Sequence, residues 1–290
     1  MSTVIGIVGG TGLYQLDGLV DQRWQRVDSP FGAPSDELLF GKLGEQRVVF
    51  LPRHGRGHRI PPHEINFLAN IDALKRAGAT QVISVSAVGS LRADLPPGTF
   101  VIADQFIDRT LRKPKTFFGT GCVAHVSMGH PTCGRLAAHL ARGADELDLG
   151  YHDGGTYVVM EGPQFSSLAE SELHRSWHAD VIGMTNMPEA KLAREAELCY
   201  ATVAMVTDFD CWHPDHDHVT VADVIKVMHG NSENAKKLLA HVIPRAGADT
   251  GPCERGCDRA LEHAILTAPD ARDPKLVEKL SAVAGRVLKS

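Results

Sequence analysis

Short runs of apolar, mostly β-branched residues recur along this chain, and segments with helical spacing of apolar residues separate them. The runs predict strands at residues 4–8, 48–51, 82–85, 101–103, 157–160, 180–184 and 202–206. Between them we expect helices opened by Pro61-Pro62 and closed by Gly78, and others near residues 133–147, 168–178 and 189–196. Continuous apolar strands alternating with helices are typical of a sheet covered on both faces, so the pattern predicts an α/β fold.

The last part of the chain has a different pattern. A long amphipathic helix is expected over about residues 221–242, followed by a linker at 245–252 and a helical remainder to residue 290. We therefore divide the chain into a single α/β domain, residues 1–245, and a helical C-terminal extension, residues 246–290, packed on or near it.

Polar, glycine-flanked clusters follow the apolar strands. They lie at residues 9–12, 53–58, 86–90, 161–167, 185–189 and 207–212. In α/β sheets the ligand crevice lies outside the carboxyl ends of the strands, so these six clusters are expected to converge on one site.

The glycine-rich cluster 9–12 is open to two interpretations. Its spacing does not fit the GxGxxG dinucleotide motif, and the stretch that follows cannot form the helix which that motif requires. Backbone N–H groups and the Thr11 hydroxyl favour an anion-binding loop. A tight turn after a strand explains the same residues equally well.

The second cluster places Arg53, His54, Arg56 and His58 within six residues. The planar fork of Arg matches phosphate oxygens, and His is able to donate a further hydrogen bond. A solvated basic loop is the alternative, but the position directly after a buried strand favours function.

Two other groups resemble metal sites superficially. His213, His216 and His218 alternate with acidic residues in a proline-containing loop, which lacks the rigidity that metal ligation needs. Cys253 and Cys257 form a CxxxC pair without a second pair, which is not a zinc signature. We therefore expect no metal ion, a polar loop near the site, and free thiols or an occasional disulfide.

Composition narrows the class of protein. A net charge of −5 over 290 residues argues against a general affinity for nucleic acid or anionic membranes. Apolar runs stay far below the roughly 20 residues of a membrane helix, and the N-terminal sequence does not resemble a signal peptide. We expect a cytoplasmic protein that captures small anions with a local set of donors.

Taken together, the motifs resemble the 5′-methylthioadenosine phosphorylases within the trimeric purine nucleoside phosphorylase family. The matching stretches are GIVGGTGLY, VDSPFGAPSD, RHGRGHRIPPHEINFLANIDALK, SAVGSLR, DQFIDRT, EGPQFSSLAES, MTNMPEAKLAREAELCYA and TDFDCW. They follow the family's order over roughly the first 245 residues. The resemblance implies a mixed, partly barrel-like sheet flanked by helices, and a homotrimer or dimer of trimers with sites near subunit boundaries. It also implies phosphorolysis in purine and methionine salvage, with inorganic phosphate as co-substrate and no cofactor.

The resemblance also implies roles for individual residues. Phosphate is expected at Thr11, Arg53, His54, Ser86, Ala87 and Thr185. Met184 is expected under the ribose, Phe165 against the purine or ribose, and Asp208 and Asp210 at the purine edge. The 5′-methylthio group is expected against Val221, Ile225 and Met228, which as an alternative are simply helix core, and His125 is expected to reach a neighbouring subunit's substrate.

Base choice and leaving-group activation both point to Asp208. Phosphorolysis needs a proton at purine N7, and two nearby carboxylates raise one pKa, which suits Asp208 as the catalytic proton carrier. Related 6-oxopurine phosphorylases usually carry Asn at this position and Glu at the position of Ser166, so Asp208 and Ser166 favour adenine. The apolar residue Val221 would favour a methylthio group over a hydroxyl.

Several alternatives remain. The nearest is a phosphorylase for 6-oxopurine nucleosides or methylthioinosine, followed by a nucleosidase that uses water. A nucleotide-binding regulatory protein on a Rossmann scaffold fails the GxGxxG test. Asn186 departs from the Thr or small residue that relatives often carry, which puts contacts around the phosphate in doubt.

Overall fold

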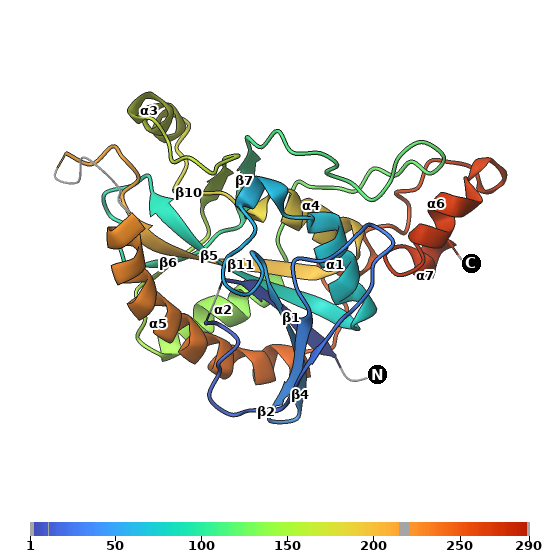
Figure 1. The fold of residues 1–290 in the computed structure, drawn as a ribbon, viewed down its shortest axis with the longest axis horizontal. Coiled ribbons are helices and arrows are strands. Elements are labelled where there is room, and N and C mark those ends of the chain that lie inside the picture. Colours follow the sequence, from blue (N-terminus) through green and yellow to red (C-terminus); the bar gives the residue numbers. More distant parts are fainter. Residues whose placement is uncertain (1–2, 11, 215–220, 289–290) are drawn as a thin grey trace.

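The long strand β5 (Ala79–Ser90) organises the sheet because it has three partners. It runs parallel to β1 (Val4–Gly9) and to β11 (Cys199–Asp208), and its last residues pair antiparallel with β10 (Val181–Gly183). The structure, a computed structural model, describes residues 3–10, 12–214 and 221–288; the side chains of residues 221–224 and 226 are outside the description. Figure 1 shows β5 beside β1, β10 and β11.

Within the described residues the strands form one mixed, 11-stranded sheet. One path through it has the order β2-β3-β4-β1-β5-β10-β9-β7, and β11, β6 and β8 branch from β5. The further strands are β2 (Leu19–Gln25), β3 (Leu38–Leu43), β4 (Gln46–Pro52), β6 (Phe100–Ile102), β7 (Gln105–Asp108), β8 (Tyr151–Asp153) and β9 (Thr156–Val159). The branched sheet with helices on both faces confirms the predicted α/β class and its mixed sheet.

The two largest hydrophobic cores of the described residues lie on the two faces of the sheet. Side chains alternate between them along β1, where Val4 and Val8 enter one core and Ile5 and Ile7 the other. The first core is covered by α1 (Phe67–Arg76) and α4 (Asn186–Glu195), and the second by α2 (Gly134–Glu146) and α5 (Val221–Ala248). The sheet is therefore buried on both sides, as its apolar strands predict.

Local caps decide where two helices begin. The Asn66 side chain accepts a hydrogen bond from the Ala69 N–H, so α1 begins at Phe67. Pro62 starts only a short 3₁₀ turn, Pro62–Glu64, so the predicted helix start at the proline pair is wrong. Helix α3 (Leu168–Ser176) begins with a capping box between Ser167 and Glu170.

The sequence pattern missed four strands of the sheet and the true end of helix α5. Strands β2, β3, β7 and β8 were not predicted, because β2, β7 and β8 are largely exposed or half-buried and lack a continuous apolar run. Helix α5 continues through Pro244 to Ala248, so the linker expected from residue 245 begins later. The Ala246 carbonyl accepts a hydrogen bond from Gln81 at 2.9 Å, and this contact helps to hold the last turn against β5.

The C-terminal segment returns to the main sheet (Figure 1). It contains the short helices α6 (Pro274–Lys279) and α7 (Gly285–Leu288) and two 3₁₀ turns, Cys257–Arg259 and Pro269–Ala271. Glu197, before β11, accepts hydrogen bonds from Arg286 and from the Leu261 N–H. Leu261 and Leu280 add buried side chains to the first core, so the segment packs on the main domain. Among the described helices, none is long and apolar enough to cross a bilayer.

A buried ion pair ties the sheet to helix α4. Arg53, directly after β4, donates to both carboxylate oxygens of Glu189 at 2.9 and 3.1 Å, and both side chains are 2% exposed. Arg53 also donates to the carbonyls of Val8 and Val85 and to the Ser84 hydroxyl. The pair therefore joins β1, β4, β5 and α4 at one point.

We predict that Arg53→Met lowers the free energy of unfolding by about 3–5 kcal/mol, because it leaves the Glu189 carboxylate buried without its cation. Adding Glu189→Gln should recover part of the loss, since the amide removes the charge and still accepts from Ser84. Urea unfolding at one fixed protein concentration measures this. In the matched control, Arg26→Met, the broken pair with Asp28 is about 80% exposed, and the loss should stay below about 1 kcal/mol. An equally small loss for Arg53→Met would contradict the assignment.

Candidate active site

The polar clusters at the strand ends meet, as the contacts between them show. Gly9 accepts from the Arg53 N–H at 2.9 Å, and Arg53 pairs with Glu189 of the fifth cluster. The third cluster contacts the fifth and the sixth: Ser86 donates to Asn186 at 3.3 Å, and the Thr207 hydroxyl lies 3.2 Å from the Val88 carbonyl. The remaining cluster joins through Cys211, whose thiol donates to the Ser166 carbonyl at 3.4 Å. All six therefore surround one region at the carboxyl ends of β1, β4, β5 and β11.

Arg53 presents less of its guanidinium than the sequence suggests. The edge formed by Nε and Nη2 is bound to Glu189, and Nη1 donates to the Val85 carbonyl at 2.9 Å. Nη1 carries two hydrogens, and the Val85 bond uses one of them. The two-pronged edge of the guanidinium that would bind phosphate is therefore occupied by Glu189. Arg53 offers phosphate a buried positive charge and one remaining N–H of Nη1.

His54 is held as a neutral imidazole. Its Nδ1 lies 2.9 Å from the Ile60 carbonyl, which only accepts, so Nδ1 carries the hydrogen. Burial, assisted by the charge of Arg53, lowers the pKa of His54 to about 4. The ring stacks on His58 with centroids 4.2 Å apart. Nε2 is consequently an acceptor, and it suits the P–OH group of hydrogen phosphate rather than a bare phosphate oxygen.

A buried amide connects the two hydroxyls assigned to phosphate. Asn186 Oδ1 accepts from Ser86 at 3.3 Å and from Thr185 at 3.4 Å, and its amide nitrogen donates to Tyr200 and Thr202. Ser86 and Thr185 are 7% and 6% exposed. Asn186, the residue that departs from the family pattern, therefore positions these two hydroxyls. The sequence alone assigned it no role of its own.

The other two residues predicted to bind phosphate are Ala87 and Thr11. Ala87 is half-buried inside β5, which continues through the predicted cluster to Ser90, and its backbone lies opposite Met205 of β11. Thr11 lies outside the described residues.

Two carboxylates lie close together at the end of β11. The Asp210 N–H donates to Asp208 Oδ1 at 2.8 Å, and the Thr207 hydroxyl donates to Oδ2 at 2.7 Å. Burial raises the pKa of Asp208 to about 6, the charge of Asp210 adds to this, and the two hydrogen bonds oppose it. Gly89 backs the pair, because a Cβ there would lie 2.8 Å from Asp208 Oδ1. Asp208 is thus poised to exchange a proton near neutral pH.

Helix α3 and Ser166 surround the second carboxylate. Burial raises the pKa of Asp210, and the nearby hydroxyls of Ser171 and Ser166 lower it. Among the described residues, Asp210 Oδ2, Ser171 Oγ and His174 Nδ1 are buried without a hydrogen bond of good geometry. Sequence reasoning missed Ser171 and His174; their i,i+3 spacing on one helix face is a signal only once α3 is known to cover Asp210.

The residues expected near the ribose and purine differ in their exposure. Met184 is half-buried and packs against Gly162, where a Cβ would come 2.5 Å from its sulfur. Gly162 also has a φ of +67°, which favours glycine. Phe165, by contrast, is 49% exposed and available to a ligand.

The predicted apolar wall belongs to the first turns of α5. Ile225 is 61% exposed and Met228 is half-buried, so neither is a fully buried core residue. The Val221 side chain is outside the described part of the structure. Of the polar loop before the helix, His213 stacks on Phe209 at 4.6 Å, whereas residues 215–220, including His216 and His218, are not described.

His125 lies apart from these groups in its own chain. It is exposed, and its N–H donates to the Ala264 carbonyl at 2.9 Å, where its loop forms a bridge between Ala124 and Ile265 of the C-terminal segment.

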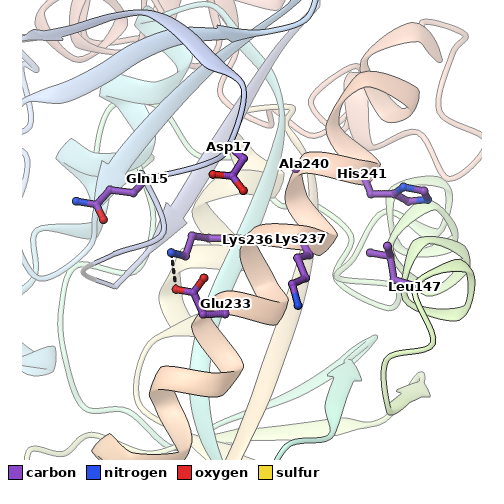
Figure 2. A pocket seen from close by; sticks show the side chains of 8 residues that line it. All are labelled: Gln15, Asp17, Leu147, Glu233, Lys236, Lys237, Ala240 and His241. Atoms are coloured by element: carbon purple, nitrogen blue, oxygen red, sulfur yellow. Dashed lines mark ion pairs between the residues drawn. The ribbon is translucent and has the colours of Figure 1, made fainter.

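Figure 2 shows a pocket between the loop after β1 and the middle of α5. A 2.6 Å ion pair between Lys236 and Glu233 lies on its wall. Its other lining residues are Gln15, Asp17, Leu147, Lys237, Ala240 and His241, and the predicted site residues are elsewhere.

Comparison with known proteins places this geometry in context. The model of the phosphorylase superfamily matches residues 4–244. An S-methyl-5′-thioadenosine phosphorylase of Cereibacter sphaeroides is 57% identical over 289 residues, which cover 100% of both chains. A methylthioadenosine phosphorylase crystal structure from an Antarctic soil metagenomic library superposes with a TM-score of 0.92 at 44% identity, over 97% of this chain and 99% of that one. A Schistosoma mansoni adenosine/methylthioadenosine phosphorylase variant, in complex with methylthioadenosine, has a TM-score of 0.79 at 37% identity, over 85% and 92% of the two chains.

Proposed function

Because this chain belongs to the phosphorylase superfamily, we propose that it splits 5′-deoxy-5′-methylthioadenosine with inorganic phosphate. The products are adenine and 5-methylthioribose 1-phosphate, so the enzyme is a pentosyltransferase of purine and methionine salvage. One observation carries the proposal. Asp208, whose pKa is raised, and the hydrogen-bond network around Arg53 and Asn186 lie at the same end of the sheet. A relative 57% identical over its full length has the corresponding name.

In this proposal one half of the site holds phosphate. Arg53 supplies a buried positive charge and one N–H, and Ser86 and Thr185 turn their hydroxyl hydrogens from Asn186 to phosphate oxygens. Neutral His54 accepts the hydrogen of HPO₄²⁻ at Nε2. The Ala87 backbone and Thr11 complete the set. Phosphate bound in this way presents a bare oxygen to C1′ of the ribose.

Asp208 carries the proton that the leaving base needs. The C1′–N9 bond breaks as the bond from C1′ to a phosphate oxygen forms, and negative charge develops on the purine. Protonated Asp208 donates to N7, and over the whole reaction hydrogen phosphate replaces this proton through solvent. A carboxyl with a pKa of about 6 is suited to this exchange, since general acids work best with a pKa close to the working pH.

Adenine selectivity is assigned to Asp208 together with Ser166. A carboxyl that shares a proton with N7 also accepts a hydrogen bond from the 6-amino group. Asp210 and Ser166 lie next to this carboxyl in the proposed site.

The alternative functions are a 6-oxopurine or methylthioinosine phosphorylase, which acts on a different base, and a nucleosidase, which does not need phosphate. Met184 and Phe165 are assigned to the ribose and purine, and Val221, Ile225 and Met228 to the methylthio group.

The assembly and surroundings of the enzyme belong to the same proposal. We assign a homotrimer or dimer of trimers in the cytoplasm, with no catalytic cofactor and no nucleic-acid or membrane partner. The exposed position of His125 on a separate loop supports its reaching a neighbouring subunit's site. Light scattering of the purified protein measures the mass of the assembly, and a monomer would contradict it.

The first prediction concerns phosphate. Adenine release from methylthioadenosine should depend on added phosphate and should yield one equivalent of methylthioribose 1-phosphate per adenine. Ultraviolet absorbance and phosphate consumption in one reaction measure both. Equal rates with and without phosphate would identify a nucleosidase, and faster turnover of methylthioinosine would identify an oxopurine phosphorylase.

The second prediction concerns Asp208. Asp208→Asn should lower kcat on methylthioadenosine by about 10²-fold or more, the scale of losing a general acid. Methylthioinosine should lose less, because the amide donates to O6, and adding Ser166→Glu should shift preference further toward it. Steady-state rates on both substrates for wild type and the two variants decide the point. Equal losses on the two bases would show that Asp208 has only a structural role.

The third prediction tests the shared site. Inactive His125→Ala and inactive Asp208→Asn subunits should regain partial activity when mixed into hybrid oligomers, because some sites then combine intact residues. Differently tagged subunits, purified through both tags, establish the mixed composition. If such hybrids stay inactive, His125 does not act across a subunit boundary.

A further inference from the structure

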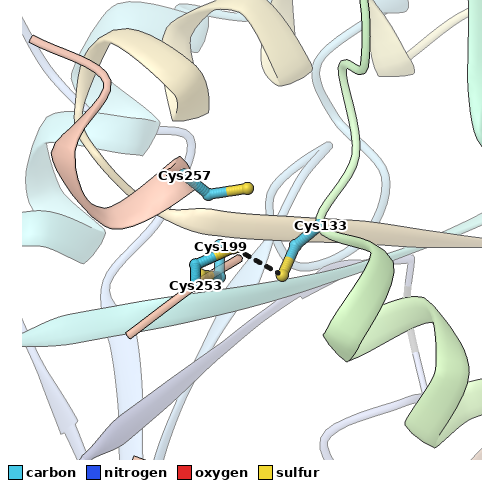
Figure 3. A group of neighbouring side chains, drawn as sticks. All are labelled: Cys133, Cys199, Cys253 and Cys257. Atoms are coloured by element: carbon cyan, nitrogen blue, oxygen red, sulfur yellow. Dashed lines mark hydrogen bonds between the residues drawn. The ribbon is translucent and has the colours of Figure 1, made fainter. Parts of the chain in front are cut away.

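Four buried cysteines meet at the end of β11 that lies away from Asp208. They are Cys133, Cys199, Cys253 and Cys257, and their sulfur atoms all lie within 4.8 Å of one another. Figure 3 shows the four side chains drawn together from three separate parts of the chain. We propose that these four thiols form a tetrahedral binding site for a zinc ion, which fastens the C-terminal segment to the main domain.

The spacing of the sulfurs fits that ion. Zinc–sulfur bonds of about 2.3 Å in a tetrahedron place neighbouring sulfurs about 3.8 Å apart. The Cys133 and Cys253 sulfurs are 3.7 Å apart, the distance expected for two ligands of one ion. A disulfide would need about 2.05 Å and would join the thiols in pairs.

The backbone around the cluster is firmly held. Cys133 immediately precedes α2, and its N–H donates to the Tyr200 carbonyl, next to Cys199, at 2.7 Å. Gly256 adopts a φ of +65° between Cys253 and Cys257, and its N–H donates to the Cys253 carbonyl at 2.8 Å. This turn folds the CxxxC segment back on itself, so both of its sulfurs reach the same point.

Arginine side chains lie near the cluster, and their positive charge would offset part of the net charge of −2 of a tetrathiolate zinc site. Cys133 is the N-cap residue of α2, so it lies at the positive end of the helix dipole. Arg135 is close enough to interact electrostatically with three of the thiols, and Arg194 with Cys257. The Arg255 guanidinium lies over Gly134, where a Cβ would be 3.0 Å from it.

This site differs from what the spacing of Cys253 and Cys257 predicts. A lone CxxxC pair lacks the second pair of a zinc motif, so the sequence predicted no metal. The fold supplies the missing ligands from residues 54 or more positions earlier, Cys133 and Cys199. On binding, each thiol releases its proton to solvent. The site does not depend on the phosphorolysis reaction.

Metal content of the untagged protein, expressed with added zinc and purified with a phosphine reductant, tests the proposal. Mass spectrometry of the metals should find about one zinc per chain in wild type and in Cys122→Ser, a buried cysteine outside the cluster. Cys253→Ser/Cys257→Ser should hold less than about a tenth of this, because two ligands remain. Its unfolding temperature should fall well below that of Cys122→Ser.

Wild type alone also decides the question if the double variant fails to fold. Cells grown with Co²⁺ in place of zinc should yield protein with the strong visible absorption of a tetrahedral cobalt thiolate site. Wild type that carries neither metal, or whose four cysteines are found in disulfides by mass mapping, would overturn the proposal. Iron bound in place of zinc would overturn the choice of ion.

Discussion

The buried pair of Arg53 and Glu189 is the constraint on which the rest of this structure depends. A guanidinium and a carboxylate that are 2% exposed must satisfy nearly all their hydrogen bonds internally, and they do so with partners from β1, β5, β11 and α4. Removing either partner would leave a charge in the core. The pair therefore holds the strand ends in the one arrangement that brings Ser86, Thr185 and Asn186 together, and it places a permanent positive charge beside them.

The other half of the site contains two buried carboxyl groups that, among the described residues, have no cation paired with them in the way that Arg53 is paired with Glu189. Asp208 and Asp210 are held near each other by a hydrogen bond from the Asp210 backbone, and both have raised pKa values because they are buried. Such an arrangement costs stability in the folded state and is tolerated where the proton is useful. The network around Arg53 and the two acids thus lie at the ends of two adjacent parallel strands, β5 and β11. The pKa of about 6 lets Asp208 change protonation state near neutral pH.

Strand β11 links this site to the C-terminal segment. Asp208 is at one end of the strand, and at the other end Glu197 and Cys199 contact the segment through Arg286, Leu261 and the cysteine cluster. The same segment bridges to the loop that carries His125. The extension therefore contacts both the strand that ends at Asp208 and the loop that carries His125.

The sequence by itself determined the α/β class, all seven of the apolar strands predicted from it and the six polar clusters, because a strand buried on both faces has a continuous apolar run and its end is marked by glycine and polar residues. It did not reveal β2, β3, β7 and β8; the side chains of β2, β7 and β8 are largely exposed or half-buried and lack that signal. The division at residue 245 and the individual residue roles stay predictions. Only the tertiary structure decided that Glu189 occupies the fork of Arg53, that Asn186 joins two hydroxyls, and that four cysteines meet. These are contacts between residues far apart in the chain, and local periodicity has no information about which distant side chains will face each other.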